Sequence, residues 1–376
     1  MAEKRKSGIL LSEKDLKRRY PDSGLASEIC FDEPHSLRLP SQNLAINFHM
    51  GGGIPYGKIL ELAGEESSGK TLLAMDFAKV CISLGGIVLW DDAEATFDGI
   101  WARKHGVDLS RVDLLPNENE FEIVSDWVAD KCVYWRSKLT HNEPILFVLD
   151  SVALMETGDA MQVAEQDAKA EMGRRSFNMG KFLRKRNKIF AKYGICVIFI
   201  NQLRVKVGAS QYEEKETTPL QQALKFYASQ RVWLFRGKRL RMGGKPKGPW
   251  VGNIVYIRTK KNKTSIPRDN IQAEVYFRPD GDKFGYHKYH GFDELVVDRG
   301  IIKRKMGRFY YKDKLLIQGE DKFKALIAND DKLRAKLIKR MGINTISKTR
   351  QQIADIKVNL YPVKSKKKKD EENPDE

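Results

Sequence analysis

The sequence has few cysteines and no long hydrophobic run, and both absences exclude classes of protein. Its four cysteines, Cys30, Cys81, Cys132 and Cys196, are widely scattered and form no Cys-x-x-Cys pair. Disulfides and a zinc site are therefore not expected, and a reducing cytoplasm fits this usage. The longest apolar stretches, such as Ile195–Ile200, are far too short to span a bilayer. We expect a cytoplasmic protein with no membrane partner.

Acidic residues are in the minority. The 376 residues include 67 Lys and Arg against 50 Asp and Glu, which gives a net charge of +17. A field of this sign attracts polyanions, either nucleic acid or an anionic membrane surface. Because no amphipathic or lipidation signal supports a membrane, nucleic acid is the expected partner. With 41% hydrophobic residues, the chain can also bury a substantial core.

Apolar runs alternate with amphipathic stretches in the middle of the chain. The runs that indicate strands are Ile59–Ala63, Ile87–Trp90, Ile145–Leu149, Ile195–Ile200 and Val232–Phe235. Helices are predicted over Lys70–Leu84, Glu120–Leu139 and Asn178–Tyr193. Buried strands separated by helices indicate an α/β fold with a mainly parallel central sheet. Asn253–Thr259 and Ile271–Phe277 follow without an intervening helix, which predicts an antiparallel edge.

The composition divides the chain into four parts. Residues 46–284 hold the alternating pattern and are predicted to form the core domain, and residues 1–45 precede it as a mixed, charged segment. Residues 285–360 indicate a small α/β unit that includes a charged helical tract from Asp321 to Met341. Residues 361–376, rich first in Lys and then in Asp and Glu, are typical of a disordered tail.

The strongest motif lies between the first predicted strand and the first predicted helix. Gly64-Glu-Glu-Ser-Ser-Gly69-Lys70-Thr71 fits G-x-x-x-x-G-K-[ST], in which backbone N–H groups and a helix N-terminus surround phosphates. In such a loop Lys70 contacts the β- and γ-phosphates, and the hydroxyl of Thr71 ligates Mg²⁺. Asp150 ends another predicted strand, where ligands bind in α/β sheets, and is expected to act on Mg²⁺ as well. ATP and Mg²⁺ are therefore the expected cofactors, and ATP hydrolysis is the expected reaction.

Several blocks of the sequence resemble the RecA recombinase family, in the same order, over roughly residues 45–320. After the phosphate loop at Glu66–Thr71, the matching blocks are Asp92-Ala-Glu94, Asp98–Asp108, Leu149–Ala153, Phe199–Arg204, Ala223–Ser229 and Lys261-Asn-Lys263. Gly307–Tyr311 and Ile317–Glu320 are similar to the C-terminal domain of that family. The resemblance implies a RecA-like P-loop ATPase core with a mainly parallel central sheet, followed by a small α/β C-terminal domain.

The resemblance also implies roles for individual residues. Glu94 would orient or deprotonate the water that attacks the γ-phosphate, and Gln202 would sense that phosphate and pass its state to the following loop. Lys261 and Lys263 would act on the γ-phosphate of a neighbouring subunit. Asp98 would hydrogen-bond adenine and Trp101 would stack on it, where the family usually has Tyr. The implied nucleotide-binding residues are Glu66, Ser67, Ser68, Gly69, Lys70, Thr71, Leu72, Asp98 and Trp101.

Two loops are implied to contact DNA. The first runs from about Thr157 to Arg175, and the second runs from Arg204 to Gln222, which is long for a compact domain. Basic and amide groups along such loops bind single strands without reading their sequence. Leu220-Gln221-Gln222 stands where the family usually has two glycines. The implied DNA-binding residues are Met172, Arg174, Arg175, Arg184, Arg204, Lys206, Gly208, Thr217 and Thr218.

The function that the resemblance implies is that of a DNA-dependent ATPase. Such a protein forms helical filaments on single-stranded DNA and pairs them with a homologous duplex in DNA repair. Residues 1–45 would then take part in oligomerisation, and residues 285–360 would interact with DNA. A ring helicase built on the same core and an ATP-gated recombination mediator are the alternatives. The Lys261-Asn-Lys263 block favours the recombinase over the helicase, and the intact Lys70 and Glu94 argue against a mediator that does not hydrolyse ATP.

Overall fold

The computed structural model describes residues 37–156, 168–205, 216–266, 270–281 and 283–355, together with Arg18. For residues 168–172 and 355 the description covers the backbone and not the side chain. The predicted disordered tail at residues 361–376 and most of the segment 1–45 therefore lie outside the described residues.

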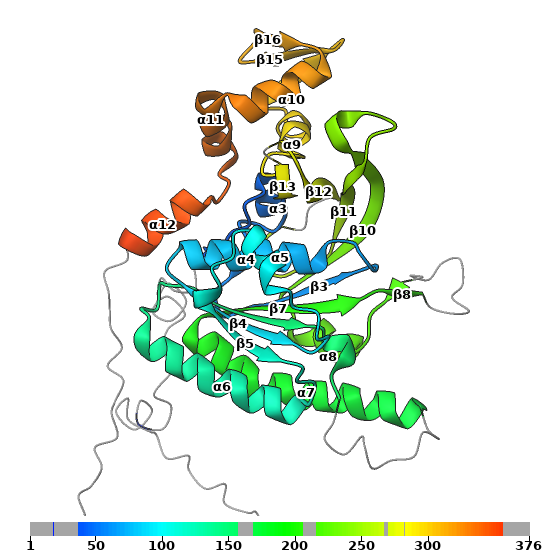
Figure 1. Cartoon of the computed structure of the whole chain (residues 1–376). Coiled ribbons are helices and arrows are strands. Elements are labelled where there is room, and N and C mark those ends of the chain that lie inside the picture. Colours follow the sequence, from blue (N-terminus) through cyan, green and yellow to red (C-terminus); the bar gives the residue numbers. More distant parts are fainter. Residues whose placement is uncertain are drawn as a thin grey trace, which may run out of the picture.

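A nine-stranded sheet forms the centre of the described chain (Figure 1). Its strands are β3 (Ile59–Gly64), β4 (Ile87–Asp92), β5 (Val112–Pro116), β6 (Ile145–Asp150), β7 (Ile195–Gln202), β10 (Gln230–Arg241), β11 (Trp250–Asn262), β12 (Ile271–Asp280) and β13 (Lys283–Tyr286). They lie in the order β13-β12-β11-β10-β3-β7-β6-β4-β5. The strands from β10 to β5 in this order are parallel, whereas β10 to β13 pair antiparallel. The predicted α/β fold with a mainly parallel sheet is confirmed.

Helices cover both faces of this sheet. They are α4 (Lys70–Ser83), α5 (Gly99–Lys104), α6 (Phe121–Lys138), α7 (Ala168–Tyr193) and α8 (Gln221–Tyr227), with short 3-10 turns at Leu109–Arg111, Val152–Leu154 and Met242–Gly244. In Figure 1, α4 and α5 lie above the sheet and α6 and α7 lie below it. Alternate residues of β4 enter opposite hydrophobic clusters, since Val88 and Trp90 pack with the α4 side and Ile87 and Leu89 with the α6 side. Burial on both faces explains why the central parallel strands β4, β6 and β7 are largely apolar.

The pairing of β10 with β11 forms a hairpin that is longer than the sequence predicted. β10 continues to Arg241 and β11 begins at Trp250, beyond the predicted strands Val232–Phe235 and Asn253–Thr259. Basic residues between Arg236 and Lys247 interrupt the apolar pattern there, so the extension carries no strand signal. The short elements β5, α5 and α8 were not predicted either, because they lack a run of apolar residues long enough to show a period.

The core extends beyond both of its predicted boundaries. Before it, β1 (Arg38–Leu39) pairs with β2 (Ile54–Pro55), and Leu37 and Leu39 are buried in the central hydrophobic cluster. After it, β13 continues the sheet to Tyr286, so the predicted boundary between residues 284 and 285 crosses a strand. The helix α3 (Leu44–His49) connects the two parts, because Leu44 packs in the hydrophobic cluster of the C-terminal unit.

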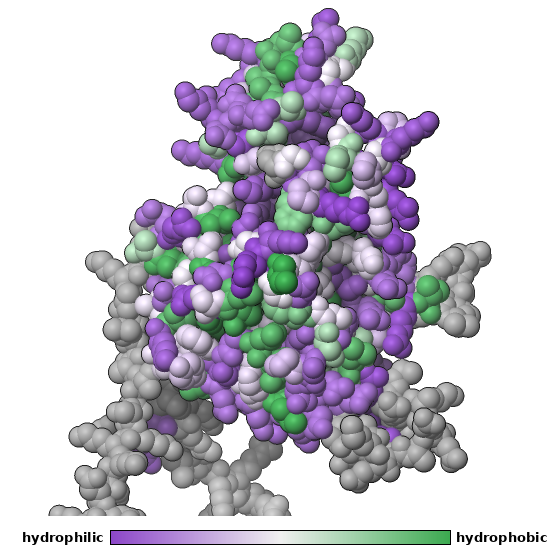
Figure 2. All heavy atoms as spheres, viewed as in Figure 1, coloured by the Kyte–Doolittle hydropathy of each residue, from purple (hydrophilic) through white to green (hydrophobic). Residues whose placement is uncertain are grey.

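The C-terminal unit consists of helices around a three-stranded sheet. Its elements are α9 (Phe292–Asp298), β14 (Ile302–Lys305), β15 (Arg308–Tyr311), β16 (Lys314–Gln318), α10 (Glu320–Asn329), α11 (Asp331–Met341) and α12 (Ile346–Asp355). The predicted helical tract Asp321–Met341 is two helices, because the Asp330 side chain caps the second one by accepting a hydrogen bond from the backbone N–H of Leu333 at 2.9 Å. On the face seen in Figure 2 the surface of this unit is largely hydrophilic.

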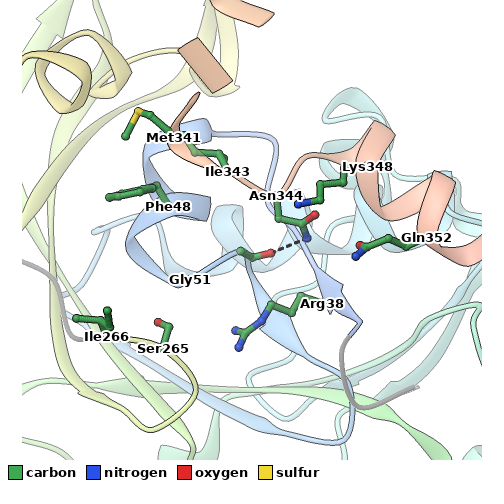
Figure 3. Close-up of a pocket in the computed structure, with 12 residues that line it drawn as sticks. Arg38, Phe48, Gly51, Ser265, Ile266, Met341, Ile343, Asn344, Lys348 and Gln352 are labelled. Atoms are coloured by element: carbon green, nitrogen blue, oxygen red, sulfur yellow. Dashed lines mark hydrogen bonds between the residues drawn. The ribbon is translucent and has the colours of Figure 1, made fainter. Parts of the chain in front are cut away.

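The chain after α11 returns to the core and attaches the C-terminal unit to it. Asn344 donates a hydrogen bond to the carbonyl oxygen of Gly52 at 3.1 Å, and Arg350 donates to that of Ser83 at 3.0 Å. Beside the first of these bonds lies a cavity of about 410 Å³, whose lining includes Arg38 and Lys348 (Figure 3). The C-terminal unit therefore has contacts on the α4 side of the sheet and does not extend from the core through a linker alone.

One carboxyl group in the central sheet is buried without a partner. Asp91 in β4 is fully buried, and among the described residues neither of its oxygens has a hydrogen-bond partner. Burial, with a smaller contribution from the charges of Glu118, Asp92 and Asp150, raises the pKa of Asp91 to about 8. The proton is therefore held by this carboxyl group well above the pH at which an exposed Asp loses it.

This raised pKa predicts that stability falls as the pH rises. The unfolded carboxyl titrates near pH 4, so between about pH 4 and pH 8 the folded state binds more protons, and each increase in pH favours unfolding. Asp91→Asn cannot titrate. We expect its melting temperature to match the wild-type value at about pH 4 and to exceed it increasingly up to about pH 8. Thermal unfolding followed from pH 4 to pH 9 measures this, with Asp130→Asn at an exposed position of α6 as the control. Parallel pH profiles for wild type and Asp91→Asn would contradict it.

Candidate nucleotide and DNA site

The phosphate loop joins the end of β3 to the start of α4. Gly69 caps the helix in the left-handed conformation, with φ of 89°, and a side chain there would lie 2.9 Å from the hydroxyl of Tyr286. That hydroxyl donates a hydrogen bond to the Gly69 carbonyl oxygen at 3.1 Å. A Cβ atom at Gly64 would lie 2.7 Å from the carbonyl oxygen of Leu234. Both glycines of the motif are thus required by the backbone around them.

The polar side chains of Lys70 and Thr71 bond to groups close to the phosphate loop. The Lys70 ammonium donates to the carbonyl oxygens of Gly64 at 3.2 Å and Glu65 at 2.8 Å, and burial lowers its pKa. The Thr71 hydroxyl donates to Asp150 Oδ2 at 3.0 Å. Burial raises the pKa of Asp150 to about 7, and the charge of Glu94 contributes in the same direction. A hydroxyl and a carboxylate in contact beside a phosphate loop are the oxygen ligands that Mg²⁺ prefers, so these residues fit that ion.

Two further predicted residues adjoin this group. Glu94 Oε1 accepts a hydrogen bond of 2.6 Å from the Ser151 hydroxyl, and the Glu94 backbone N–H donates to the carbonyl oxygen of Asp150 at 3.2 Å. Gln202 pairs with Gly64 in the register of β7 and β3, at the start of the phosphate loop. The sheet therefore brings Lys70, Thr71, Asp150, Glu94 and Gln202 to one place, at the carboxyl ends of its parallel strands.

A cavity of about 430 Å³ lies next to the phosphate loop. Trp101 of α5 lines it, as expected for a base-stacking residue, and so does Leu72. The Asp98 side chain is the N-cap of α5 and accepts hydrogen bonds from the N–H groups of Ile100 at 2.8 Å and Trp101 at 3.0 Å. Its contact with adenine stays a prediction. The remaining predicted residues of the loop are Glu66 and Ser67, which are exposed, and Ser68, which is buried.

The cavity has a second wall that the sequence did not reveal. Trp250, Asn253, Val275 and Phe277, from β11 and β12, line it together with the phosphate loop. These residues lie 178 or more positions beyond Leu72 in the sequence and belong to no motif. Only the pairing of β10 with β3 and β11 shows that they lie near the nucleotide site. An aromatic residue in a basic hairpin was the one available signal.

The residues predicted for the first DNA loop divide into two groups. Residues 157–167 and the side chain of Met172 lie outside the description. Arg174 and Arg184 are exposed on α7. Arg175 is half-buried instead, and its guanidinium donates to the carbonyl oxygens of Met155, at 2.9 Å, and Ala153. Its donors hold the chain at the base of the loop in this structure, and its role as a DNA contact stays a prediction.

The second DNA loop begins and ends in a short antiparallel pair. β8 (Arg204–Val205) pairs with β9 (Glu216–Thr217), and Arg204 is exposed opposite the half-buried Thr217. Lys206 and Gly208 lie outside the described residues. Thr218 is buried and donates to Glu61 Oε1 at 3.0 Å, so it belongs to the interior and not to a DNA-facing surface.

Thr218 is part of a buried polar network around Glu61. This glutamate of β3 is fully buried and forms an ion pair with Arg231 of β10. Asn201 Nδ2 donates to Glu61 Oε1 at 3.0 Å and to the carbonyl oxygen of Pro219 at 2.9 Å. Asn201 Oδ1 in turn accepts the N–H of Gln202 at 2.9 Å. The network thus connects the strand before the phosphate loop with Gln202 and with the end of the second DNA loop.

Lys261 and Lys263 lie away from the phosphate loop of their own chain. Lys261 lies near the end of β11, beyond Ile257, where the register of β11 with β12 ends, and Lys263 directly follows the strand. The Lys261 ammonium donates to the carbonyl oxygen of Lys225 at the end of α8, at 2.6 Å, and Lys263 is exposed. Burial lowers the pKa of Lys261, and the charges of Lys263 and Arg231 act in the same direction.

No helix within the described ranges is long and apolar enough to cross a membrane.

The model of the RecA N-terminal domain matches residues 33–281. The protein RecA of Thermotoga neapolitana is 32% identical over 82% of this chain and 83% of its own length. Protein RecA of Corynebacterium glutamicum is 31% identical over 88% of this chain and 84% of its own length. Protein RecA of Geobacter sulfurreducens is 30% identical over 85% of this chain and 90% of its own length.

The match spans the phosphate loop, the strands that carry Glu94, Asp150 and Gln202, and the hairpin that ends in Lys261 and Lys263. The ordered blocks of the sequence, the strand order and the family model agree with one another. The chain belongs to the RecA family of DNA-recombination ATPases.

Proposed function

We propose that this chain binds ATP with Mg²⁺, forms helical filaments on single-stranded DNA, and uses them to pair and exchange strands with homologous double-stranded DNA. The observation that supports it best is the contact of the Thr71–Asp150 pair with the Ser151–Glu94 pair at one end of the sheet. Phosphate binding, metal binding and activation of a nucleophile then take place at adjacent atoms.

Each residue of this site has a distinct part in hydrolysis. The phosphate-loop amides and Lys70 hold the β- and γ-phosphates, and Thr71 and Asp150 would hold Mg²⁺. When bound, this ion neutralises charge on the phosphates. Glu94 orients the attacking water and accepts its proton, and the Ser151 hydroxyl fixes the carboxylate by its hydrogen bond to Oε1.

DNA is the second substrate in this proposal. Arg174 and Arg184 on α7, Arg204 on β8 and the two adjoining loops would contact the phosphates of a single strand. Gln202 would respond to the γ-phosphate, and the network of Asn201 and Glu61 would pass that response to Thr218 and Pro219 at the end of the second loop. Electron microscopy with single-stranded DNA and a slowly hydrolysed ATP analogue tests the assembly. Helical filaments support the proposal, and closed rings would indicate the helicase alternative.

Glu94→Gln should lower DNA-dependent ATP turnover roughly 100-fold or more, because the variant keeps the hydrogen bond to Ser151 but cannot accept a proton. Nucleotide-dependent DNA binding should persist, since the phosphate-binding groups are intact. Lys70→Ala should instead weaken nucleotide binding itself. Phosphate release and fluorescence anisotropy of labelled DNA measure the two effects, with Glu122→Gln on the exposed side of α6 as the control. Unchanged turnover in Glu94→Gln would refute the assignment.

Contacts with DNA phosphates make affinity depend on salt. Affinity for single strands should fall linearly on a log–log plot against salt, with a slope of about −0.7 per neutralised phosphate. Arg174→Ala/Arg204→Ala should therefore reduce the magnitude of the slope by roughly 1.4 and weaken all sequences alike. Lys188→Ala/Lys192→Ala, at the other end of α7, is the matched control and should keep the wild-type slope. A strong sequence preference would point to a regulator that reads bases.

Lys261 and Lys263 should act on the nucleotide of a neighbouring subunit. Lys261 pairs with Arg231, which is level with Glu61, three residues before Gly64. Strands rise about 3.3 Å per residue, so the backbone of Lys261 lies about 10 Å along the sheet from the start of the phosphate loop. The ammonium group of Lys261 contacts α8. A head-to-tail interface, which propagates as a helix, would bring both lysines to the next subunit.

Mixing two inactive variants tests this arrangement. Glu94→Gln combined with Lys261→Ala/Lys263→Ala should regain part of the DNA-dependent turnover, because some interfaces in a mixed filament pair an intact Glu94 with intact lysines. Asp150→Asn mixed with Glu94→Gln is the control and should regain none, since both changes lie on the same side of the interface. No recovery in the first mixture, with co-assembly verified by labelled subunits, would show that the lysines do not act between subunits.

A further inference from the structure

A two-residue turn in the C-terminal unit holds a methionine in an unfavourable conformation. β14 pairs with β15 up to Lys305 opposite Arg308, so Met306 and Gly307 alone form the turn between the strands. Both have positive φ angles, 48° and 72°, as in a type I′ turn, whose first position favours Asn, Asp or Gly. The side chain of Met306 is also fully exposed, and no other large hydrophobic side chain in the described part of the chain is as exposed.

The residue pair that closes this turn is unfavourable as well. Lys305 and Arg308 are both exposed, and like charges directly opposite each other destabilise a pair of strands. The preceding Arg304 forms an ion pair with Glu320 at 2.8 Å, whereas neither Lys305 nor Arg308 has an acidic partner among the described residues. Local choices that oppose the fold are expected where a function requires them. The turn thus presents a cation on each side of an apolar side chain.

The tip formed by residues 305–308 is fixed to the rest of the C-terminal unit. Next to it, Phe309 is buried and its ring stacks on that of Phe323 in α10, with centroids 4.0 Å apart. The Gly307 carbonyl oxygen accepts a hydrogen bond of 2.9 Å from the N–H of Gly319, directly before α10. In Figure 1, β15 and β16 lie at the end of the unit that is farthest from the central sheet. The tip is therefore a supported projection.

We propose that this tip acts as a wedge on duplex DNA, in which Lys305 and Arg308 contact phosphates on the two sides of a groove and Met306 inserts at a base step and unstacks it. Proteins that kink a duplex insert apolar side chains, Met among them, between base steps, and cations contact the phosphates around such a step. This inference rests on the proposed function, in which the chain takes up a homologous duplex, and it adds a residue that deforms that duplex.

The chemistry of the tip favours a duplex over other partners. A protein interface usually has a core of several apolar side chains, whereas the turn presents Met306 alone among cations. Free bases of a single strand stack on aromatic rings, and neither residue of the turn is aromatic. A base stack between two rows of phosphates offers an apolar interior and negative charge on both sides of it. These are the two properties that the tip complements.

Base stacking is measured with short duplexes that carry 2-aminopurine, whose fluorescence rises when the base is unstacked. The full-length chain is titrated at low salt without nucleotide, so the readout does not need filament assembly. Fluorescence should rise with the wild type, and Met306→Asn should lose most of that rise. Met306→Leu keeps an apolar wedge and should retain it. Because Asn favours the left-handed conformation of the turn, Met306→Asn should melt at or above the wild-type temperature, which separates loss of the wedge from unfolding.

Binding of the duplex should depend on the two cations and not on the methionine. Duplex affinity falls with salt with a log–log slope of about −0.9 per neutralised phosphate, so Lys305→Gln/Arg308→Gln should reduce the magnitude of the slope by about 1.8. Met306→Asn removes no charge and should keep the wild-type slope. Lys332→Gln/Lys336→Gln, at two exposed positions of α11, is the matched control and should keep it too.

The outcomes distinguish this inference from the proposed function, because filament formation is scored separately by electron microscopy. Leu315→Asn changes another exposed apolar side chain of the same unit and should retain the fluorescence rise. No rise with the wild type, or an equal rise with Met306→Asn, would overturn the proposal. Binding to phosphatidylglycerol vesicles that Met306→Asn abolishes, without any effect of this change on the duplex, would overturn it as well and indicate a membrane surface.

Discussion

The buried ion pair of Glu61 and Arg231 is the constraint on which the site depends. Removing two charges from water costs several kcal/mol per ion unless their geometry and hydrogen bonds offset it. Here Asn201 and Thr218 supply the additional hydrogen bonds to the carboxylate. The pair can exist only because β3 lies between β7 and β10, so that three strands and the end of the second DNA loop meet at one carboxylate. A displacement of any of these segments would leave a buried charge without its partners, so they are expected to move together or not at all.

The same pair determines where the lysines of β11 lie. Arg231 is opposite Glu61 on one side and opposite Lys261 on the other, in the registers of β10 with β3 and with β11. Gln202 is connected to Glu61 through Asn201. The groups proposed to sense the γ-phosphate, to hold DNA and to act on the next subunit are thus attached to a single buried cluster. This geometry offers a physical route by which binding of nucleotide and assembly on DNA could influence each other.

The sequence predicted those parts whose signal is local. The phosphate loop, the five parallel apolar strands and the antiparallel pair lie where their patterns indicated, and the resemblance located Glu94 and Gln202. The sequence could not show which way a side chain points. Arg175 and Thr218 were therefore predicted as DNA contacts, although their hydrogen-bond donors bond to groups of the protein itself. Trp250 was missed because its partners in the cavity are distant in sequence and its own neighbours are basic. The buried Glu61 gave no signal either, since one polar residue does not alter the pattern of an apolar strand.

Carboxylates crowd the carboxyl end of the sheet, and their mutual repulsion favours a cation at this place. Asp92, Glu94 and Asp150 lie on or directly after two neighbouring strands, and burial with neighbouring charge raises the pKa of Asp150 to about 7. The charge of Lys70 opposes that of Asp150, with an ammonium group whose own pKa is lowered by burial. A nucleoside triphosphate would add further negative charge at the same place. A divalent ion held by Thr71 and Asp150 would offset this charge and favour the ionised carboxylate, so the residues that fit Mg²⁺ would also make ATP binding depend on it.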